Sequence, residues 1–219
     1  GGPLVCGDSS MPIKRISTDS RTVGPDTLFV PIIGERVNAH KFIDSALKDG
    51  GAALTQEHDH AEGPHPFIRV ADTLKAMQQI ASYYRNKMSL PIIGITGSVG
   101  KTTTREMIAH VPLTLDRLTS KDEIGVLEMG MSEPGQITIL GEIIHPNAAV
   151  GTNVGVSHIE QMGSRENICR EKLDIQNGLP KDGVLYLNGD NDMIRKHIDY
   201  VTHPYELFGF SKRYCFVAV

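Results

Sequence analysis

A glycine-rich stretch in the middle of the chain, Gly94-Ile-Thr-Gly-Ser-Val-Gly-Lys-Thr-Thr-Thr104, constrains the fold more than any other feature. An apolar run at residues 90–93 precedes it, and a helix-compatible segment at residues 102–109 follows it. A strand, a glycine turn and a helix in this order direct backbone N–H groups and the positive end of a helix dipole at an anion. The sequence therefore predicts a phosphate-binding loop that holds a nucleoside triphosphate, rather than a glycine-rich turn with an exposed lysine.

The side chains of this loop have separate expected roles. Lys101 is placed to reach the terminal phosphates, and the Thr102 hydroxyl is placed to bind magnesium. The spacing is a variant of the standard G-x-x-x-x-G-K-T pattern, because Ile95 stands where the first glycine is expected. The predicted nucleotide-contacting residues of the loop are Gly97, Ser98, Val99, Gly100, Lys101, Thr102 and Thr103.

The composition is ordinary for a globular protein and argues against two classes of partner. The chain has 26 acidic and 22 basic residues among 219, and it has no Lys/Arg cluster, so we expect no nucleic-acid surface. No apolar run approaches the length of a membrane span, so we expect no membrane insertion. Three widely spaced cysteines, Cys6, Cys169 and Cys215, indicate reduced buried thiols of a cytoplasmic protein.

The pattern changes near residue 88 and predicts two α/β domains, residues 1–88 and 89–219. In the first, small domain, short strand candidates alternate with one short helix, and a longer helix at residues 72–88 follows, with Asp72 as its N-cap. The strand candidates of this domain are residues 27–33, 52–55 and 67–70, and its short helix is residues 40–48.

The second domain alternates strands and helices, which predicts a mainly parallel sheet with helices on both faces. Its expected strands are residues 91–96, 124–129, 148–153 and 184–187, and its expected helices are residues 102–109, 136–144 and 165–178. Ligands of such sheets bind where the carboxyl ends of the strands meet. We therefore expect the chemistry of this domain at that edge, next to the phosphate loop.

Three further residues are candidates for this edge. Glu128 ends an apolar run, so its carboxylate should emerge near the phosphate loop and hold magnesium, unless it is an ordinary surface glutamate. His158 follows a predicted strand, where a neutral imidazole is able to bind a metal but where a lone histidine is usually a loop residue. Lys172 lies in a helix that Ser164 can cap, and its residue type alone indicates a solvated lysine.

Several motifs, in order along nearly the whole chain, resemble the Mur ligases of bacterial cell-wall synthesis. Those of the second domain are Thr96-Gly-Ser-Val-Gly-Lys-Thr-Thr103, Leu127-Glu-Met-Gly-Met131, Thr152-Asn-Val-Gly155, Ser157-His-Ile-Glu160, Gly163-Ser164, Glu171-Lys172 and Asn188-Gly-Asp-Asn191. Those of the first domain are Ser17-Thr-Asp-Ser-Arg-Thr-Val23, Leu28-Phe-Val-Pro31 and Gly34-Glu-Arg36. Within the family, the Glu-Met-Gly-Met element is similar to that of the member that adds D-alanyl-D-alanine.

The resemblance implies an ATP-dependent ligase that forms an amide bond during peptidoglycan precursor synthesis. The carboxylate of UDP-N-acetylmuramoyl-tripeptide would attack the γ-phosphate of ATP and give an acyl phosphate. The amine of D-alanyl-D-alanine would then attack the acyl phosphate and release inorganic phosphate. The catalytic residues that the resemblance implies are Lys101, Glu128, His158 and Lys172.

The resemblance also implies metal ligands and substrate contacts. Thr102 and Glu128 would hold one magnesium ion and His158 a second, with a carbamylated Lys172 beside them. The motif that contains Asn191 would lie near the adenine of ATP.

The implied substrate contacts are Asp19, Ser20 and Arg21 for the uridine diphosphate group and Asn153 and Ser157 at the edge of the central sheet. For Asp19 and Ser20, a capped turn is the alternative. The protein would be a cytoplasmic monomer.

Two departures from the family pattern affect these expectations. The family has a longer stretch after the loop helix, whereas His110 here runs directly into Val111. Either the sequence omits a disordered loop there, or the chain carries a real deletion. The family also has a C-terminal domain that receives the incoming amine, and it is absent from a chain that ends at Val219. We therefore expect this chain to bind the UDP substrate, and ATP weakly, without turnover on its own.

Other interpretations stay open at this stage. A sister ligase or a folate polyglutamate synthetase would share the loop, as would a nucleotide switch or a transport ATPase. An inactive UDP-substrate-binding paralogue is a third class. The histidines His58, His60 and His65 resemble a metal cluster, but the proline and glycine around them favour an exposed loop. His40, at a helix start, is expected to be structural or near the substrate.

Overall fold

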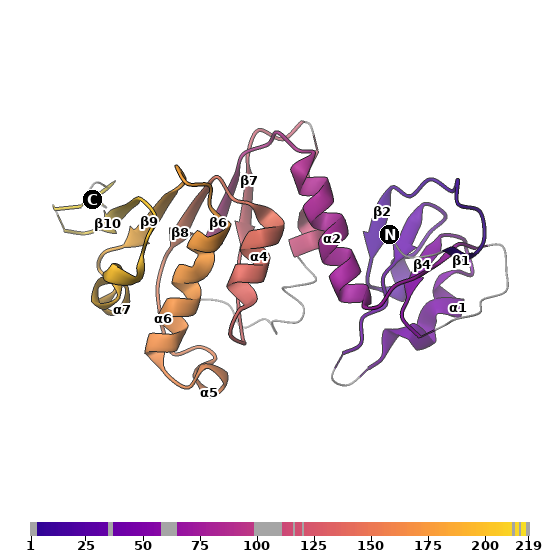
Figure 1. The fold of residues 1–219 in the computed structure, drawn as a ribbon, viewed down its shortest axis with the longest axis horizontal. Helices are drawn as coiled ribbons and strands as arrows, with labels where there is room; N and C mark the ends of the chain where they lie inside the picture. Colours follow the sequence, from indigo (N-terminus) through magenta and orange to yellow (C-terminus); the bar gives the residue numbers. More distant parts are fainter. Residues whose placement is uncertain are drawn as a thin grey trace. The chain divides into compact units, whose positions relative to one another are not determined.

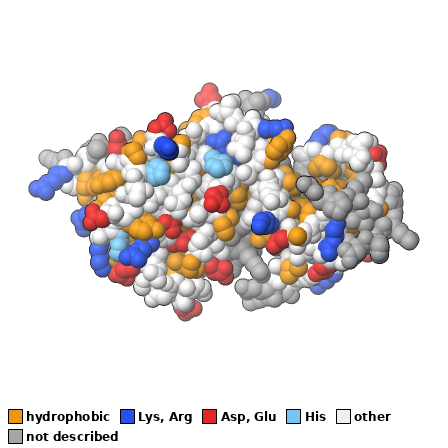
Figure 2. Space-filling view, in the orientation of Figure 1, with side chains coloured by type: hydrophobic (Ala, Val, Ile, Leu, Met, Phe, Trp, Pro, Cys, Tyr) orange, Lys and Arg blue, Asp and Glu red, His pale blue; other side chains and the backbone are white. Residues whose placement is uncertain are grey.

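A computed structural model describes residues 4–34, 37–57, 65–98, 111–115, 117–119, 121–211, 213–214 and 216–217. The chain folds as two compact units, Gly1–Ala81 and Ser82–Val219, each with a β-sheet of its own (Figure 1). Acidic and basic side chains are interspersed over the face that Figure 2 shows. No helix of the described residues is both long enough and apolar enough to cross a membrane.

The first unit contains a five-stranded sheet with the order β1-β5-β4-β3-β2. Strands β2 to β5 pair in parallel, and β1 pairs antiparallel with β5. The strands are β1 (Leu4–Cys6), β2 (Arg15–Ser17), β3 (Thr27–Phe29), β4 (Ala52–Thr55) and β5 (Phe67–Arg69). Strands β3 and β4 are buried along their whole length, as expected for parallel strands that are covered on both faces.

Short helical turns cover this sheet and complete the core of the first unit. They are the 3-10 helices η1 (Ser20–Thr22) and η2 (Ala39–Phe42) and the helix α1 (Ile43–Ala46). The core contains Phe29 of β3, Ala53 of β4 and Ile43 of α1, all of them almost fully buried. The helix expected at residues 40–48 is thus confirmed as two short turns, η2 followed by α1.

The strand expected at residues 27–33 is shorter than predicted. It ends at Phe29, although the N–H of Val30 still donates to the carbonyl of Ser17 at 2.8 Å. Pro31 follows and has no N–H to donate, so the ladder cannot continue. Strands β1 and β2 have three residues each and were not predicted, because such short segments show no periodic apolar pattern.

Helix α2 (Thr73–Asn86) follows the first sheet. The Asp72 carboxylate accepts from the N–H of Lys75 at 2.8 Å, which confirms the predicted N-cap. Near the other end, the buried Arg85 donates through Nε to the carbonyl of Ile144 at 2.6 Å and through Nη2 to the carbonyl of His145 at 3.1 Å. Arg85 therefore fastens the last turn of α2, which belongs to the second unit, to the end of α4 in that same unit by charge-assisted hydrogen bonds.

The second unit contains a six-stranded sheet with the order β11-β10-β9-β8-β6-β7, and all neighbouring strands pair in parallel. The strands are β6 (Ile92–Thr96), β7 (Gly125–Glu128), β8 (Ala148–Gly151), β9 (Val184–Asn188), β10 (Tyr205–Gly209) and β11 (Phe216–Val217). The predicted α/β class with a mainly parallel sheet is confirmed. The expected helix at residues 102–109 and the junction of His110 with Val111 lie wholly or partly outside the described residues.

Helices follow the strands of this sheet in the expected order. They are α4 (Gln136–Ile144), α5 (Ile159–Met162), α6 (Arg165–Leu173), η3 (Asp174–Gly178), α7 (Asp192–Lys196) and η4 (Ile198–Tyr200). Helix α4 has the predicted bounds, whereas the helix expected at residues 165–178 becomes α6 followed by the 3-10 turn η3. Helices α4 and α6 lie next to each other in front of the sheet (Figure 1).

A buried carboxylate joins α6 to α4. Glu171, which is 5% exposed, accepts from the N–H groups of Gly135 at 2.8 Å and Ile137 at 2.9 Å. These N–H groups belong to the start of α4, where the helix dipole favours a negative charge. The pair of hydrogen bonds fixes the position of α6 against the loop that follows β7.

Helix α4 and turn η3 pack so closely that two glycines meet. A Cβ atom added to Gly178 would lie 2.6 Å from the Cα and from the carbonyl oxygen of Gly141. Because both of these atoms are backbone atoms, they cannot move away as a side chain would.

We expect Gly178→Ala to lower the free energy of unfolding by about 1–3 kcal/mol, because the added methyl group forces α4 and η3 apart. Chemical denaturation of the purified variant measures this change. Gly24→Ala is the control, since its Cβ would come no closer than 3.4 Å, to the flexible end of Arg15. Equal stability of Gly178→Ala and the parent protein would contradict the close packing.

Candidate functional site

The carboxyl ends of the central strands meet at the start of the phosphate loop. Strand β6 ends at Thr96, which lies opposite Gly151 of β8, and Ile95 lies opposite Glu128 of β7. Of the predicted nucleotide-contacting residues, Gly97 and Ser98 are described. The others lie outside the described residues: Val99, Gly100, Lys101, Thr102 and Thr103.

The loop that follows β8 makes three hydrogen bonds to Ser98. The N–H of Ser98 donates to Asn153 Oδ1 at 2.8 Å, and its carbonyl accepts from Ser157 Oγ at 3.0 Å. Its hydroxyl accepts from the N–H of Gly155 at 2.7 Å. Asn153 and Ser157, which we expected at the substrate edge, therefore fix the backbone of the phosphate loop.

The residue before Ser98 has room for a hydrogen atom only. A Cβ atom at Gly97 would overlap Thr152 Oγ1 and would lie 3.0 Å from Asn153 Oδ1. The Thr152 hydroxyl is itself engaged, since it donates to the carbonyl of Thr96 at 3.1 Å. The glycine of the motif is thus required by the close approach of the loop after β8.

Lys172 reaches the same loop from helix α6. Its side chain is buried, with the residue 6% exposed, and Nζ donates to the carbonyl of Gly97 at 2.6 Å. Burial lowers the pKa of Lys172 to about 8, and the negative charges of Glu128 and Glu171 partly offset this effect. The interpretation of Lys172 as a solvated helix residue, which its residue type suggested, is therefore wrong.

Glu128 is the last residue of strand β7, and His158 lies in the loop between β8 and α5. Glu128 is exposed at the carboxyl end of β7 and acts electrostatically on Lys172. His158 has a φ of 64° and directly precedes helix α5, so its backbone makes the turn into that helix. Among the described residues, no three His, Cys, Asp or Glu side chains gather closely enough to hold a metal by themselves.

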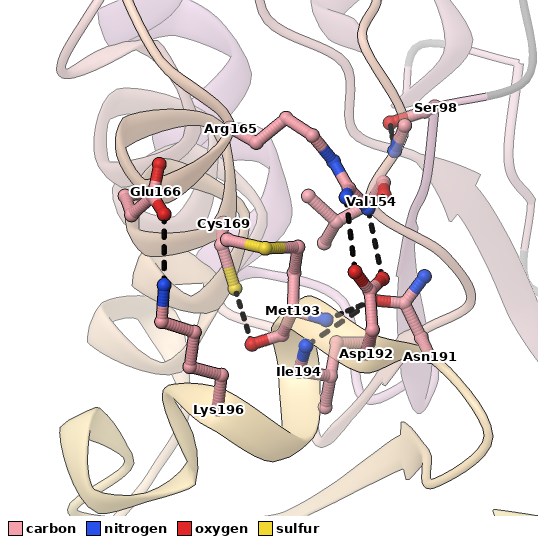
Figure 3. A network of polar contacts seen from close by, with 11 residues as sticks. Ser98, Val154, Arg165, Glu166, Cys169, Asn191, Asp192, Met193, Ile194 and Lys196 are labelled. Atoms are coloured by element: carbon pink, nitrogen blue, oxygen red, sulfur yellow. Dashed lines mark hydrogen bonds and ion pairs between the residues drawn. The ribbon is translucent and has the colours of Figure 1, made fainter.

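The motif that was expected near the adenine lies at the carboxyl end of β9. Asn191 Oδ1 accepts from the N–H groups of Met193 and Ile194, both at 3.2 Å, and so caps helix α7 (Figure 3). Asn188 Nδ2 donates to the carbonyl of Thr152 at 2.8 Å. The motif is thus hydrogen-bonded to the segment that holds the phosphate loop.

Arg165 is a residue of this edge that the sequence did not reveal. Its guanidinium group donates to both carboxylate oxygens of Asp192, at 2.9 and 2.8 Å, and to the carbonyl of Val154 at 2.9 Å (Figure 3). A lone arginine in the first turn of a helix forms no recognisable motif, so only its three-dimensional contacts identify it.

In the first unit, the predicted UDP-contacting residues follow strand β2. Asp19 caps the turn η1, and its carboxylate accepts from Arg21 Nε at 2.9 Å and from Arg21 Nη2 at 2.7 Å. These hydrogen bonds from Arg21 lower the pKa of Asp19 to about 2. Ser20 is the first residue of η1. The capped turn is therefore present, and the Arg21 side chain is 85% exposed beside it.

His40 is almost fully buried in the same unit, with an exposure of 2%. Its Nε2 accepts from the N–H of Gln56 at 3.2 Å, so its Nδ1 carries the proton and donates to Asn38 Oδ1 at 2.9 Å. Gln56 in turn accepts from the N–H of Thr73 at 2.9 Å. His40 thus has a structural role that joins η2, the end of β4 and the start of α2.

The remaining histidines and cysteines form no site in the described part of the chain. Cys169 is buried and free, its thiol donates to the carbonyl of Met193 at 3.4 Å, and burial raises its pKa to about 11. Cys6 is free and half-buried. His58, His60 and Cys215 lie outside the described residues.

A separate cleft of about 670 Å³ lies at the opposite edge of the central sheet, where β6 and β7 begin. Leu90, Leu118 and Glu123 are among the residues that line it. None of the described candidate residues lines this cleft, so its size does not mark the site.

The buried amine of Lys172 predicts a specific dependence of stability on pH. Between about pH 8 and the ordinary lysine pKa of 10.5, the unfolded chain binds more protons at Lys172 than the folded chain does. The contribution of Lys172 to stability therefore rises with pH across this range, by at most about 3 kcal/mol. Lys172→Met removes the titrating group while it keeps most of the side-chain volume.

We expect the difference in unfolding free energy between the parent protein and Lys172→Met to shift in favour of the parent between pH 8 and pH 10. Urea denaturation at several pH values, in solutions free of carbon dioxide so that the amine stays unmodified, measures this difference. A difference that stays constant over the range would show that Lys172 titrates as an ordinary exposed lysine.

Comparison with known proteins places this arrangement in a family. A family model described as "Mur ligase family, catalytic domain" matches residues 12–85, and one described as "Mur ligase middle domain" matches residues 109–214. The UDP-N-acetylmuramoyl-tripeptide–D-alanyl-D-alanine ligase of Bacillus subtilis is 39% identical over 215 residues, which cover 88% of this chain and 47% of that protein. The enzyme of that name from Escherichia coli is 32% identical over 200 residues, with coverages of 82% and 44%.

Solved structures agree with the sequence comparison. MurF from Acinetobacter baumannii superimposes with a TM-score of 0.80 at 30% identity, covering 90% of this chain and 48% of that one. MurF from Thermotoga maritima in complex with ADP gives a TM-score of 0.76 at 27% identity, with coverages of 93% and 52%. The chain thus spans about half the length of the relatives that it matches. Two family models that succeed each other along the sequence, and relatives in both comparisons, show that the chain belongs to the Mur ligase family.

Proposed function

We propose that this chain is the substrate- and ATP-binding part of a ligase that joins D-alanyl-D-alanine to UDP-N-acetylmuramoyl-tripeptide. The observation that carries the proposal is the phosphate loop, whose first residues are held by the loop after β8 and by Lys172. Relatives of up to 39% identity bear the name of this ligase, which favours it over a sister ligase of another specificity. We also propose that residues 1–88 form the UDP-substrate domain and residues 89–219 the ATP domain.

The phosphate loop gives the ATP site its anion-binding backbone. The N–H of Ser98 already donates to Asn153, so it is not free for phosphate. The contacts to phosphate would then come from later residues of the loop and from Lys101, as the sequence predicts. Asn191 is proposed near the adenine; its side-chain oxygen caps α7, which leaves its NH2 group to donate to a base.

Magnesium fits the donors of this edge in part. The exposed carboxylate of Glu128 is an oxygen ligand of the kind that magnesium prefers, and magnesium commonly completes its shell with water and substrate phosphates. Thr102 and His158 are the other proposed ligands. When bound, the two proposed ions would neutralise the charge between ATP and the substrate carboxylate.

Lys172 fits this site only after a chemical change. An amine is no ligand for magnesium, whereas a carbamate offers carboxylate-like oxygens. Carbamylation joins the unprotonated amine to carbon dioxide and releases one proton. The lowered pKa of Lys172 increases the unprotonated fraction near neutral pH, which favours this reaction over that of an ordinary lysine. We therefore propose that Lys172 is carbamylated when the site binds magnesium.

The uridine diphosphate group is assigned to the carboxyl edge of the first sheet. Asp19, Ser20 and Arg21 follow β2 there, and the exposed guanidinium of Arg21 is the group that would meet a diphosphate. Since Arg21 is paired with Asp19, the diphosphate would compete with that carboxylate for it. The proposed substrates imply a cytoplasmic protein, and we propose that it acts as a monomer.

The proposed activity predicts that the intact protein containing this chain releases ADP only when both acceptor and donor are present. The assay supplies ATP, magnesium and UDP-N-acetylmuramoyl-tripeptide, with or without D-alanyl-D-alanine. Turnover with a single amino acid in place of the dipeptide would point to a sister ligase. Binding of the UDP substrate with no ADP release under any condition would point to an inactive paralogue.

The role of Asn153 predicts a selective loss of nucleotide affinity. We expect Asn153→Ala to weaken ADP binding about tenfold, because the N–H of Ser98 loses its acceptor and with it one of the three hydrogen bonds that the loop after β8 makes to this residue. Calorimetric titration with ADP measures the change. Asn177→Ala is the matched control, since it removes a hydrogen bond of 3.0 Å to Thr138 on the α4–η3 surface. Equal affinities of the two variants would refute this role.

A further inference from the structure

Arg165 connects two segments that follow strands β8 and β9, at the edge of the central sheet where we propose that ATP binds. It is the first residue of α6, directly after the N-cap Ser164. Figure 3 shows its guanidinium between the segment at Val154 and the start of α7 at Asp192. The two hydrogen bonds to Asp192 form a bidentate fork, and Nη2 makes the third hydrogen bond, to the Val154 carbonyl.

The first partner belongs to the segment that positions the phosphate loop. Val154 stands between Asn153, which accepts from the N–H of Ser98, and Gly155, whose N–H donates to the Ser98 hydroxyl. A hydrogen bond to the Val154 carbonyl therefore restrains the peptide between these two contacts. Val154 is itself 3% exposed, so the segment is packed as well as hydrogen-bonded.

The second partner belongs to the segment at the end of β9. Asp192 is the first residue of α7 and directly follows Asn191, the cap of that helix. The fork to Arg165 fixes the direction of the first turn of α7, because a planar guanidinium and a carboxylate allow one relative orientation. One side chain thus restrains both the phosphate side and the proposed base side of the nucleotide site.

The pair itself adds little to overall stability. The side chain of Arg165 is 34% exposed and that of Asp192 is 61% exposed, and exposed ion pairs typically contribute little to folding stability. The contact matters through its geometry, because it connects the loop after β8 to the start of α7.

We propose that Arg165 is a positioning residue that couples the phosphate loop to the adenine-side segment and so sets the affinity for adenine nucleotides. The proposal rests on the proposed function, because it assumes that this edge binds ATP. It assigns to Arg165 no contact with the nucleotide itself.

The chain contains a matched control for this proposal. Lys196 Nζ donates to Glu166 Oε1 at 3.0 Å, and this exposed pair also joins α6 to α7 (Figure 3). It makes no hydrogen bond to the segment at Val154 in the described structure. Lys196→Ala therefore removes an ion pair between the same two helices and leaves the phosphate-loop segment untouched.

The experiment compares ADP binding by calorimetry for the parent protein, Arg165→Ala, Arg165→Lys, Asp192→Ala and Lys196→Ala. Binding of UDP-N-acetylmuramoyl-tripeptide and the midpoint of thermal unfolding are measured on the same samples. We expect Arg165→Ala to weaken ADP binding roughly fivefold, with UDP-substrate binding unchanged. Asp192→Ala, which keeps the Val154 contact, and Arg165→Lys, which keeps the charge, should lose less, and Lys196→Ala should match the parent.

Several outcomes would overturn the proposal. Unchanged ADP affinity in Arg165→Ala would do so directly, and an equal loss in Lys196→Ala would reduce the effect to general helix pairing. A parallel loss of UDP-substrate binding and thermal stability in both Arg165 variants would show a purely structural role. Failure of the parent protein to bind ADP would instead refute the proposed function, and the positioning role with it.

Discussion

The position of Ser98 is the constraint on which the candidate site depends. Its N–H, its carbonyl and its hydroxyl are all hydrogen-bonded by a single segment, residues 153–157, which follows strand β8. Because β6 and β8 are paired in parallel, that segment begins directly beside the end of β6. The parallel sheet thus places Gly97 and Ser98, where the phosphate loop begins, without any ligand, and such preorganisation reduces the entropy that binding must overcome.

A second set of contacts involves two charged side chains of helix α6 that are buried away from water. Lys172 is buried, its amine donates a hydrogen bond to the Gly97 carbonyl, and burial lowers its pKa. On the preceding residue, Glu171 is buried too, but two N–H groups at the start of α4 compensate its charge. Adjacent residues of one helix therefore have different roles: Glu171 fixes the helix in the fold, and Lys172 brings a buried amine to the start of the phosphate loop.

The sequence was informative where a pattern is long or chemically specific. The parallel α/β class, the bounds of α4 and the strand before the phosphate loop all follow from periodic apolar residues and glycine spacing. The caps of α2 by Asp72 and of α6 by Ser164 follow from residue type and position. Short elements such as β1, β2 and α7 contain too few residues for a periodic pattern to show. Pairing with neighbouring strands defines β1 and β2.

The candidate site residues also divide into those that a local sequence pattern predicts and those that it does not. Gly97 and Ser98 were predicted to contact the nucleotide because the loop motif is local, and Glu128 was predicted at the sheet edge because it ends a strand. The burial of Lys172 and the contacts of Arg165 depend on residues more than 10 positions away, so no local pattern reports them. Asn153 and Ser157 lie at the predicted edge of the sheet, where they are hydrogen-bonded to Ser98, and their contact with substrate stays a prediction.

Residue-resolved hydrogen exchange at the Ser98 amide in the nucleotide-free protein tests the central claim most directly. If the segment after β8 holds the phosphate loop before ATP arrives, the Ser98 N–H is protected, and ADP adds little to that protection. Exchange at the rate of an unstructured amide, with protection appearing only when ADP is bound, would show that the nucleotide orders this part of the loop and would contradict the account.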